Sequence, residues 1–301
     1  GVASNDTEMG FSVSCDSTGL EYSGGSFATL FAQKKNYFSL KHWRLILDIL
    51  KFNRVSKQRL ASNNLDESVT INDFIEQLKL SKQFREKYLI PMGAAIWSSG
   101  LEQMGEFPAL YFLKFFKNHG LLNITDRPQW KVIKDGSKSY VDKLLQKSQF
   151  LIKKNTTVVA VLCKQGVVEI TVEESAGHVV QQFDHVIMAC HSDQALGLLV
   201  EATTEQQNVL SKLAYSNNEV VLHTDISLLP ANGSTWSSWN YRIRSEFTQS
   251  ATLSYSMNIL QGIESSTQFI VTLNDTNNID PKAILGVYQY SHPVYNQGTI
   301  I

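Results

Sequence analysis

The period of the hydrophobic pattern changes near residue 120, and this change constrains the fold more than any other feature of the chain. Between residues 26 and 120, apolar residues recur mostly at helical spacing, which predicts a largely α-helical region. Its longest helix is expected over residues 39–61, with Ser39 as the N-cap. Trp43, Leu47 and Leu50 fall mostly on one face of that helix.

Capping signals predict further helices in the same region. Thr70 and Asp73 form a capping box, and Ser81 caps another helix, which Pro91 is expected to end. The stretch IPMGAAIWSSG is then expected to be a loop. An apolar helix follows in EFPALYFLKFFKNHG and closes at Gly120.

Beyond residue 120, short β-branched runs alternate with helical segments. Strands are predicted at residues 129–134, 157–163, 167–172 and 183–190, and helices at 137–146 and 192–200, the latter capped by Ser192. This order is typical of an α/β fold in which the strand over 183–190 is parallel and buried. An antiparallel sheet is predicted from the runs 219–224, 235–242, 251–256 and 268–273, and a hairpin from 10–14 and 20–22.

Charge and cysteine content exclude several classes of protein. The net charge is -1 and the pI about 6.7, with no basic stripe, so we expect no nucleic-acid partner. Three cysteines without a CxxC pair argue against a disulfide framework or a zinc ribbon, and no metal site is expected. No apolar run is long enough for a transmembrane segment and no signal peptide opens the chain. We therefore predict a cytoplasmic protein. The composition is also compatible with a peripheral contact to a membrane.

Short catalytic motifs are missing from the sequence. It contains no GxSxG, no GxxxxGK[ST] and no HExxH, and the seven histidines lack metal-ligand spacing. His191 follows a predicted parallel strand and precedes a helix, which is where open α/β sheets bind ligands; the alternative is a histidine that only bonds its loop. Trp97, Trp130, Trp236 and Trp239 lie in or beside predicted loops and strand edges, where each either lines an apolar pocket or packs in the core. Motifs alone do not separate an enzyme from a binding module.

Several segments together resemble one family of proteins. They are LEYSGGSFATLFAQKKN, PMGAAIWS, FLKFFKNHGLL, RPQWKVIKDGSKSYV, FDHVIMACHSDQAL, NEVVLHTDISLLP, WSSWNY, MNILQ, FIVTLN and HPVY. In this order they resemble the flavin-containing, amine-oxidase-like NAD(P)/FAD-dependent oxidoreductases. That family includes free-standing bacterial proteins and the N-terminal region of plant cyclopropane fatty acid synthases. The resemblance covers nearly the whole chain.

The resemblance implies a fold like that of monoamine oxidases. A Rossmann-type FAD-binding domain, assembled from separate chain segments, would carry an inserted substrate domain with helices and an antiparallel sheet. Residues 1–120 would form the first, mostly helical part of the substrate domain, 121–202 the second segment of the FAD-binding domain, and 203–301 the substrate-domain sheet. The GxGxxG segment and the closing motif along the flavin are not in the sequence, so we expect a fragment.

The resemblance also implies the cofactor and its contacts. FAD would be contacted by Val158 through its main chain and by Ala189 and His191 near its ADP half. Gly136 lies in the tight turn where the chain enters the nucleotide-binding domain, so its own contact with FAD would be secondary. A weak substrate pocket is assigned to Trp97, Trp239 and Tyr255.

The expected function is hydride transfer from a small or lipid-like substrate to flavin, and no catalytic residue is identified. Amine oxidases carry a lysine near the flavin N5, where this chain offers Val221 or His223. A desaturase-like reaction on unsaturated or cyclopropane fatty acyl chains is therefore as plausible as amine oxidation, with FPALYFLKFF as a candidate acyl site or as core. The alternative is a non-catalytic binding or scaffolding module that keeps the flavoprotein fold.

Overall fold

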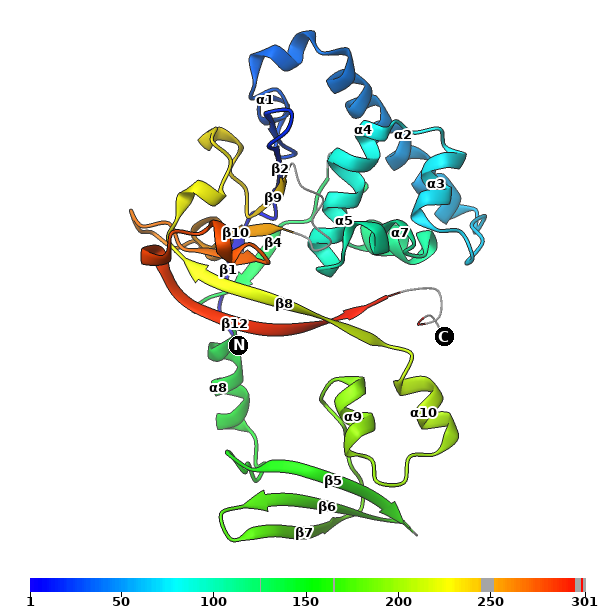
Figure 1. The fold of residues 1–301 in the computed structure, drawn as a ribbon, viewed down its shortest axis with the longest axis vertical. Helices are drawn as coiled ribbons and strands as arrows, with labels where there is room; N and C mark the ends of the chain where they lie inside the picture. Colours follow the sequence, from blue (N-terminus) through cyan, green and yellow to red (C-terminus); the bar gives the residue numbers. More distant parts are fainter. Residues whose placement is uncertain (125, 165, 245–251, 296–298, 300–301) are drawn as a thin grey trace. The chain divides into compact units, whose positions relative to one another are not determined.

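The computed structural model describes residues 1–124, 126–164, 166–244, 252–295 and 299. The chain divides into two compact units, which we describe separately (Figure 1). Unit 1 comprises Gly1–Lys143 and Ser216–His292, and unit 2 comprises Leu144–Tyr215 and Pro293–Ile301. The model has mixed α/β structure.

A mixed sheet is the framework of unit 1. In the part of the chain that the structure describes it has seven strands, in the order β12-β8-β11-β10-β9-β2-β3. Their bounds are β2 Phe11–Cys15, β3 Leu20–Ser23, β8 Ala214–His223, β9 Trp239–Ile243, β10 Leu253–Ser256, β11 Ile270–Leu273 and β12 Ile284–Val294. The predicted hairpin (β2–β3) and the predicted strands β8 to β11 are confirmed, with antiparallel pairing in β8-β11-β10-β9. Strand β2 runs parallel to β9, which joins the N-terminal hairpin to the later strands.

Helices gather beside β2 and β9, as Figure 1 shows for α3, α4, α5 and α7. The helical segments are α1 Phe27–Leu30, η1 Lys34–Phe38, α2 Leu40–Ala61, α3 Ile71–Gln77, α4 Lys82–Phe84, η2 Arg85–Leu89, α5 Ile90–Trp97, α6 Leu101–Gly105, α7 Ala109–Asn118 and α11 Met257–Gln261. The caps predicted from the sequence are present, because Ser39 accepts from the His42 N–H and Thr70 from the Asp73 N–H.

The predicted stop at Pro91 and the loop after it are wrong. The chain stays helical from α4 through a π-helical turn, η2, into α5, which ends only at Ser98 in a left-handed conformation. Pro91 has no N–H to donate to the carbonyl of Lys87, four residues earlier. The buried Tyr22 hydroxyl donates to that carbonyl instead, at 2.6 Å. The sheet thus supplies the hydrogen bond that the proline removes, and the helix continues.

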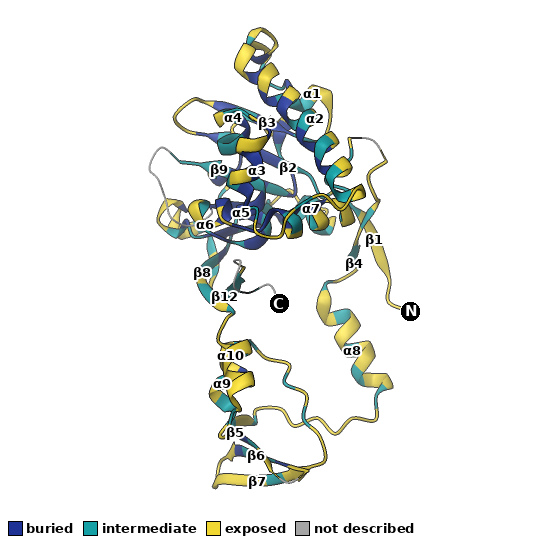
Figure 2. Cartoon of the chain, turned by 90° about the vertical axis from the view of Figure 1, so that its right-hand side faces the viewer, coloured by how far each residue is buried: buried dark blue, intermediate teal, exposed yellow. Residues whose placement is uncertain are grey.

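Aromatic side chains make the core between these helices. Phe112 stacks on Phe116 with ring centroids 4.2 Å apart, and Phe52 contacts Phe74 and Phe84. The helix α5 packs on β9 and β10 through two small residues, Ala94 and Ala95. Figure 2 shows that buried residues, in dark blue, concentrate in this helical and sheet region of unit 1.

A strand pair and a turn precede the second unit. Strand β1, Ser4–Thr7, pairs antiparallel with β4, Trp130–Ile133, which confirms the predicted strand. Asp135 and Gly136 both have positive φ, 64° and 77°, and turn the chain into α8, Ser137–Lys147. Among the described residues of α8, none is buried, and the helix is mostly yellow in Figure 2.

Among its described residues, unit 2 contains a three-stranded antiparallel sheet and two helices that follow the end of α8. The elements are β5 Thr157–Lys164, β6 Val167–Glu174, β7 Gly177–Phe183, α9 Ser192–Leu198 and α10 Thr204–Leu210. The predicted β5–β6 pair is confirmed.

The predicted buried parallel strand over 183–190 is wrong. Only Phe183 belongs to a strand, as the last residue of β7, and the chain from 184 to 190 is irregular although it contains the β-branched pair Val186 and Ile187. A strand needs a hydrogen-bonding neighbour on at least one edge, and none pairs with this segment within the described residues. Ile187 is accordingly 92% exposed. The N-cap of α9 is His191, not Ser192 as predicted.

Candidate functional site

An apolar cavity in unit 1 is the strongest candidate for a ligand site. Its volume is about 90 Å³, which is small beside the 300–1,000 Å³ of a typical ligand pocket and suits part of an apolar molecule. The residues that line it come from distant parts of the sequence: Met9, Gly10, Phe11, Met92, Ile96, Phe115, His119, Leu121, Trp130 and Trp239.

Stacked rings form one wall of this cavity. The imidazole of His119 stacks on Phe115 with centroids 3.9 Å apart, and on Trp130 at 5.9 Å with nearly parallel planes. Phe115 and His119 are four residues apart at the end of α7, so they lie on the same face of the helix. Trp130 begins β4 and brings the third ring to the stack. The faces of these rings offer apolar surface to a ligand.

Two polar groups accompany these apolar walls. His119 Nδ1 lies 2.9 Å from the Phe115 carbonyl oxygen, and because a carbonyl only accepts, Nδ1 must carry the proton. In the neutral ring Nε2 therefore keeps a lone pair. The indole Nε1 of Trp239 is buried and has no hydrogen-bond partner in the part of the chain that the structure describes. Each can bond a polar group on a ligand.

The three residues predicted for the substrate pocket lie at or next to this cavity. Trp239 lines it. Tyr255 packs edge-on against Trp239, with centroids 5.1 Å apart, and burial raises its pKa to about 12, so the phenol is neutral. Trp97 is buried behind the wall, where its ring lies 4.9 Å from that of Phe115. Their assignment to a substrate site stays a prediction.

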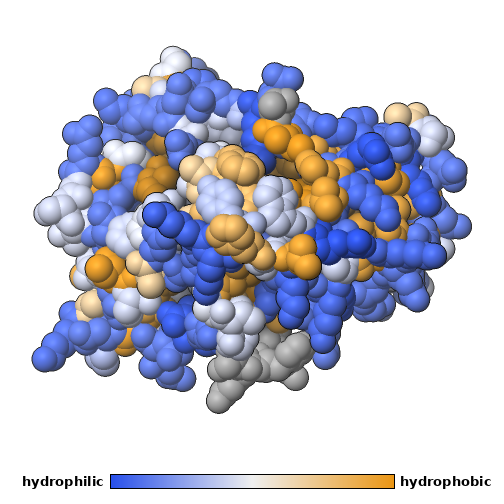
Figure 3. Space-filling view, turned by 90° about the horizontal axis from the view of Figure 1, so that it is seen from above, coloured by the Kyte–Doolittle hydropathy of each residue, from blue (hydrophilic) through white to orange (hydrophobic). Residues whose placement is uncertain are grey.

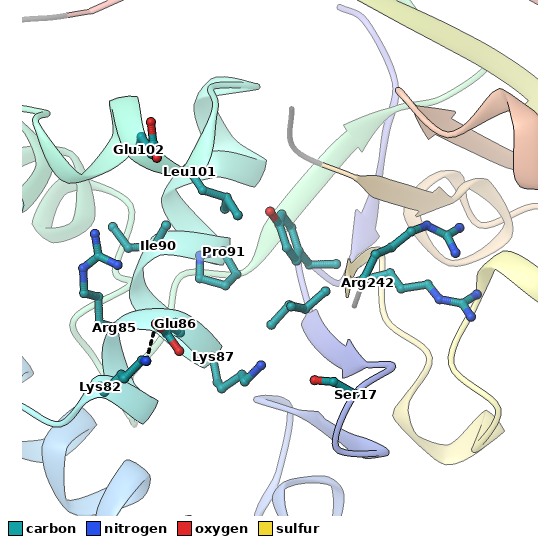
Figure 4. A pocket seen from close by; sticks show the side chains of 13 residues that line it. Ser17, Lys82, Arg85, Glu86, Lys87, Ile90, Pro91, Leu101, Glu102 and Arg242 are labelled. Carbon is teal, nitrogen blue, oxygen red and sulfur yellow. Dashed lines mark ion pairs between the residues drawn. The ribbon is translucent and has the colours of Figure 1, made fainter. Parts of the chain in front are cut away.

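A second, larger cavity in unit 1 is polar and rich in cations. It has a volume of about 360 Å³ and lies between η2, α5 and β9, as Figure 4 shows. The charged residues around it are Lys82, Arg85, Glu86, Lys87, Glu102, Arg242 and Arg244. Most of these charges already have partners: Arg242 and Arg244 pair with Asp16, and Lys82 pairs with Glu86. Arg85, Lys87 and Glu102 form no ion pair within the described residues, and Arg85 donates to the neutral Asn72 Oδ1.

Lys87 also contacts a thiol beneath this second cavity. Its Nζ lies 2.9 Å from Sγ of the buried Cys15. Burial raises the pKa of the Cys15 thiol, but hydrogen bonds with Lys87, Ser17 and Thr18 and the Lys87 charge outweigh it and lower the pKa to about 7. A substantial fraction of Cys15 is therefore thiolate near neutral pH.

The residues predicted to contact FAD fall into both units. Val158 and Ala189 are exposed in unit 2, and a β-bulge follows Val158 in strand β5. His191 stacks on Tyr215 with centroids 4.5 Å apart, so its ring already has a partner. A Cβ at Gly136 would meet nothing within 4 Å, so this glycine serves the turn and not a close approach. No observation brings the four together, and their role stays a prediction.

Val221 and His223, the two positions that the resemblance sets against the amine-oxidase lysine, are both buried in β8. Val221 belongs to an apolar cluster, and His223 has a fully buried side chain. His223 Nε2 donates to Thr272 Oγ1 at 2.7 Å, while Nδ1 accepts from the Asp225 N–H. Burial lowers the pKa of His223 more than the nearby Asp225 raises it, so the ring is neutral at neutral pH. Both nitrogens are engaged inside the protein.

Most residues of the apolar cavity, His119 among them, were not assigned to a pocket from the sequence. His119 gave no signal because it is isolated in sequence from other histidines and cysteines, although its spacing from Phe115 already placed both on one helix face. Trp130, one of the four tryptophans for which the sequence left a pocket wall or the core open, lines this cavity, and the pairing of β1 with β4 fixes its position. Within the described ranges, no group of three His, Cys, Asp or Glu side chains is arranged to hold a metal ion.

The fold resembles that of known enzymes. A CLA-producing fatty acid isomerase from P. acnes matches 96% of this chain and 69% of its own, with a TM-score of 0.61 and 13% sequence identity. Putrescine oxidase bound to putrescine matches 99% of this chain and 73% of its own, with a TM-score of 0.60 and 12% identity. No protein-family model and no curated protein matches the sequence. At these identities the similarity establishes the amine-oxidase-like fold alone.

Proposed function

We propose that this chain is part of an FAD-dependent oxidoreductase of the amine-oxidase-like kind. The main observation behind this proposal is the similarity of the fold. Nearly the whole chain matches the structures of two enzymes that have different substrates. The ten ordered sequence segments support the same kind of enzyme independently of the coordinates. FAD, when bound, supplies the redox chemistry, and the protein supplies orientation and electrostatics.

The exposure of two residues in unit 2 supports the proposed contact with the adenine side of FAD. Val158 and Ala189 are open to a ligand, and the bulge after Val158 locally interrupts the β5–β6 register. The ring of His191 would contribute through the face opposite Tyr215. Gly136 would hold the turn and make at most a minor contact. The GxGxxG phosphate cradle is absent from the sequence, so these residues support adenine binding and not pyrophosphate binding.

An acyl chain fits the apolar cavity better than a cationic amine does. No carboxylate lines this cavity among the residues that the structure describes, and an ammonium group buried without a partner is strongly unfavourable. The stacked walls of Phe115, His119 and Trp130 favour a chain with double bonds or a cyclopropane ring. We therefore propose an unsaturated or cyclopropane fatty acyl substrate, with a hydride passing from a substrate C–H to the flavin.

Flavin content is the first test of this proposal. The protein from the full gene should be yellow after purification or after incubation with FAD, with the absorption bands of bound flavin. His191→Ala should weaken FAD binding several-fold, whereas His178→Ala, at a histidine on β7, should not. A folded full-length protein that takes up no FAD would contradict an oxidoreductase and favour a non-catalytic module with the same fold.

The acyl site has its own test. We expect Trp239→Ala to weaken binding of a fluorescent unsaturated fatty acid about tenfold, because it removes one wall of the cavity. Trp236→Ala is the matched control: Trp236 lies three residues earlier, outside the cavity, and its Nε1 donates to the Pro230 carbonyl. Equal affinities in both variants, or uptake of putrescine with no uptake of the fatty acid, would refute the acyl assignment.

A further inference from the structure

An apolar stripe runs along the exposed side of α2. Leu40, Trp43, Leu47 and Leu50 follow one another at spacings of three, four and three residues, so they share one face of the helix. All four are exposed. The core face of α2, which carries the buried Leu45 and other residues, lies roughly opposite. The helix is therefore apolar on its outer face, which protein packing alone does not require.

The stripe continues into an aromatic platform at the start of the helix. The buried ring of Phe31 is surrounded by Phe27, Tyr37 and Trp43, with centroids 4.7, 4.5 and 4.9 Å away. Trp43 Nε1 donates to the Tyr37 carbonyl at 2.9 Å, which ties η1 to α2. Phe38, at the end of η1, and Leu40, at the start of α2, are almost completely exposed to solvent, with exposed fractions of 92% and 86%.

We call this surface the α1–α2 apolar face; it comprises Phe27, Tyr37, Phe38, Leu40, Trp43, Leu47 and Leu50. Figure 3 is seen from above Figure 1, from the side on which α1 and the start of α2 are drawn there. It shows apolar and aromatic side chains gathered among hydrophilic ones. Monomeric proteins seldom leave such a contiguous patch uncovered unless it binds something.

The charged residues of the segment that carries most of this face, residues 22–47, are all positive. No Asp or Glu occurs between Glu21 and Asp48, while Lys34, Lys35, Lys41 and Arg44 do. Arg44 pairs with the buried Asp48 at 3.1 Å. The three lysines are exposed, and Lys35 donates only to a neutral acceptor, the Gly19 carbonyl. An excess of positive charge therefore borders the apolar face, in a chain whose net charge is -1.

We propose that the α1–α2 apolar face docks on the surface of a bilayer that contains anionic lipids. Aromatic rings and leucines insert at the boundary between headgroups and acyl chains, while lysines beside them neutralise anionic headgroups. No helix in the described part of the chain is long and apolar enough to cross a membrane, so the contact is peripheral. The proposal rests on this surface alone and holds whether or not the protein oxidises acyl chains.

Cosedimentation with lipid vesicles tests the apolar part of the surface. The full-length protein should pellet with vesicles of phosphatidylcholine and phosphatidylglycerol. Phe38→Ser with Leu40→Ser should weaken this binding at least tenfold, because two inserted side chains are lost. The matched control is Phe150→Ser with Leu151→Ser, the same substitutions at residues that are 73% and 89% exposed in unit 2. The control should bind like the wild-type protein.

Charge reversal tests the lysines. Lys34→Glu with Lys41→Glu should weaken binding more than tenfold, since each lysine near an anionic surface contributes about 1 kcal/mol. Lys57→Glu, at an exposed residue nearer the other end of α2, should change it little. Added salt and pure phosphatidylcholine vesicles should both weaken binding of the wild-type protein.

Three results would overturn the proposal, provided that circular dichroism shows each protein to be folded. One is a wild-type protein that ignores anionic vesicles. Another is an equal loss of binding in the Phe150/Leu151 control, which would make any exposed apolar pair sufficient. The third combines two observations. Analytical ultracentrifugation shows a wild-type dimer that the Phe38→Ser, Leu40→Ser double substitution dissociates, and neither protein binds vesicles. The face would then be an interface between two protein molecules.

Discussion

The ammonium group of Lys87 lies 2.9 Å from the sulfur of Cys15 and links the turn η2 to the end of strand β2. The folded-state pKa of this thiol, about 7, is below the value near 8.5 of a thiol in an unfolded chain. The folded state therefore binds the proton less tightly. Its contribution to stability is present above the unfolded pKa and is lost as the pH falls through about 7.

Replacing the thiol should remove this part of the pH dependence. Between about pH 9 and pH 6 the free energy of unfolding of the wild-type protein should fall by about 2 kcal/mol more than that of Cys15→Ser. Urea denaturation at a series of pH values measures both curves. Cys163→Ser, at an exposed thiol, serves as the control. Parallel curves for wild type and Cys15→Ser would mean that Lys87 does not stabilise a thiolate.

The hydrogen bond from Tyr22 to the Lys87 carbonyl should be coupled to Pro91. Tyr22→Phe leaves that carbonyl without its donor, and we expect a loss of about 1–3 kcal/mol in the free energy of unfolding. In a Pro91→Ala background the backbone N–H of residue 91 becomes available, so the same change should cost less than about 1 kcal/mol. Urea denaturation of the four proteins gives the coupling. An identical loss in both backgrounds would disprove the compensation.

Gly93 should tolerate no side chain, because α5 packs closely on α6 and α7 there. A Cβ at this position would lie 2.6 Å from Met104 Sδ and 2.9 Å from Phe112 Cε2. We expect Gly93→Ala to lower the free energy of unfolding by about 1–3 kcal/mol. Gly197→Ala in α9 meets nothing within 4 Å and should instead stabilise its helix by about 0.5–1 kcal/mol. Thermal denaturation followed by circular dichroism distinguishes the two, and a stable Gly93→Ala protein would show that the core can yield.

Local signals in the sequence predicted the elements that local physics decides. Capping side chains such as Ser39 and Thr70 act within their own helix, and alternating residues predicted the hairpin of β2 and β3. The errors lie where distant contacts decide. The helix continues through Pro91 because Tyr22, from strand β3, donates a hydrogen bond to the Lys87 carbonyl. Residues 184–190 form no strand because no partner pairs with them in the described chain.

The candidate site was less predictable than the fold for the same reason. The cavity walls come from β2, α5, α7, β4 and β9, and no short stretch of sequence contains more than a few of them. Trp239 could be proposed because loop-borne tryptophans often line pockets. His119 could not, because its stacking partner Trp130 reaches it only when β4 pairs with β1. The apolar face of α2 was visible as a periodicity, but its exposure appears only in the structure.

Asn240 should be intolerant of even an isosteric acid, because its side-chain amide joins three strands. Its Oδ1 accepts from Ser12 and from the Ser237 N–H, and its Nδ2 donates to the carbonyls of Ser237 and Ser254. Asn240→Asp keeps the acceptors and places a buried carboxylate against two carbonyl oxygens. We expect a loss of about 3 kcal/mol in the free energy of unfolding at neutral pH.

Part of that loss should return in acid, where the protonated carboxyl group of the Asn240→Asp variant can donate again to one carbonyl. Because this carboxyl would have a raised pKa in the folded state, the deficit of the variant relative to wild type should shrink as the pH falls through that pKa. Asn217→Asp is the control. The side chain of the exposed Asn217 accepts a hydrogen bond from Ser291, and an aspartate at this position can still accept it. Chemical denaturation from neutral to mildly acidic pH measures all three proteins. A deficit in Asn240→Asp that is small, or that does not change with pH, would show that the amide donors do not hold the strands together.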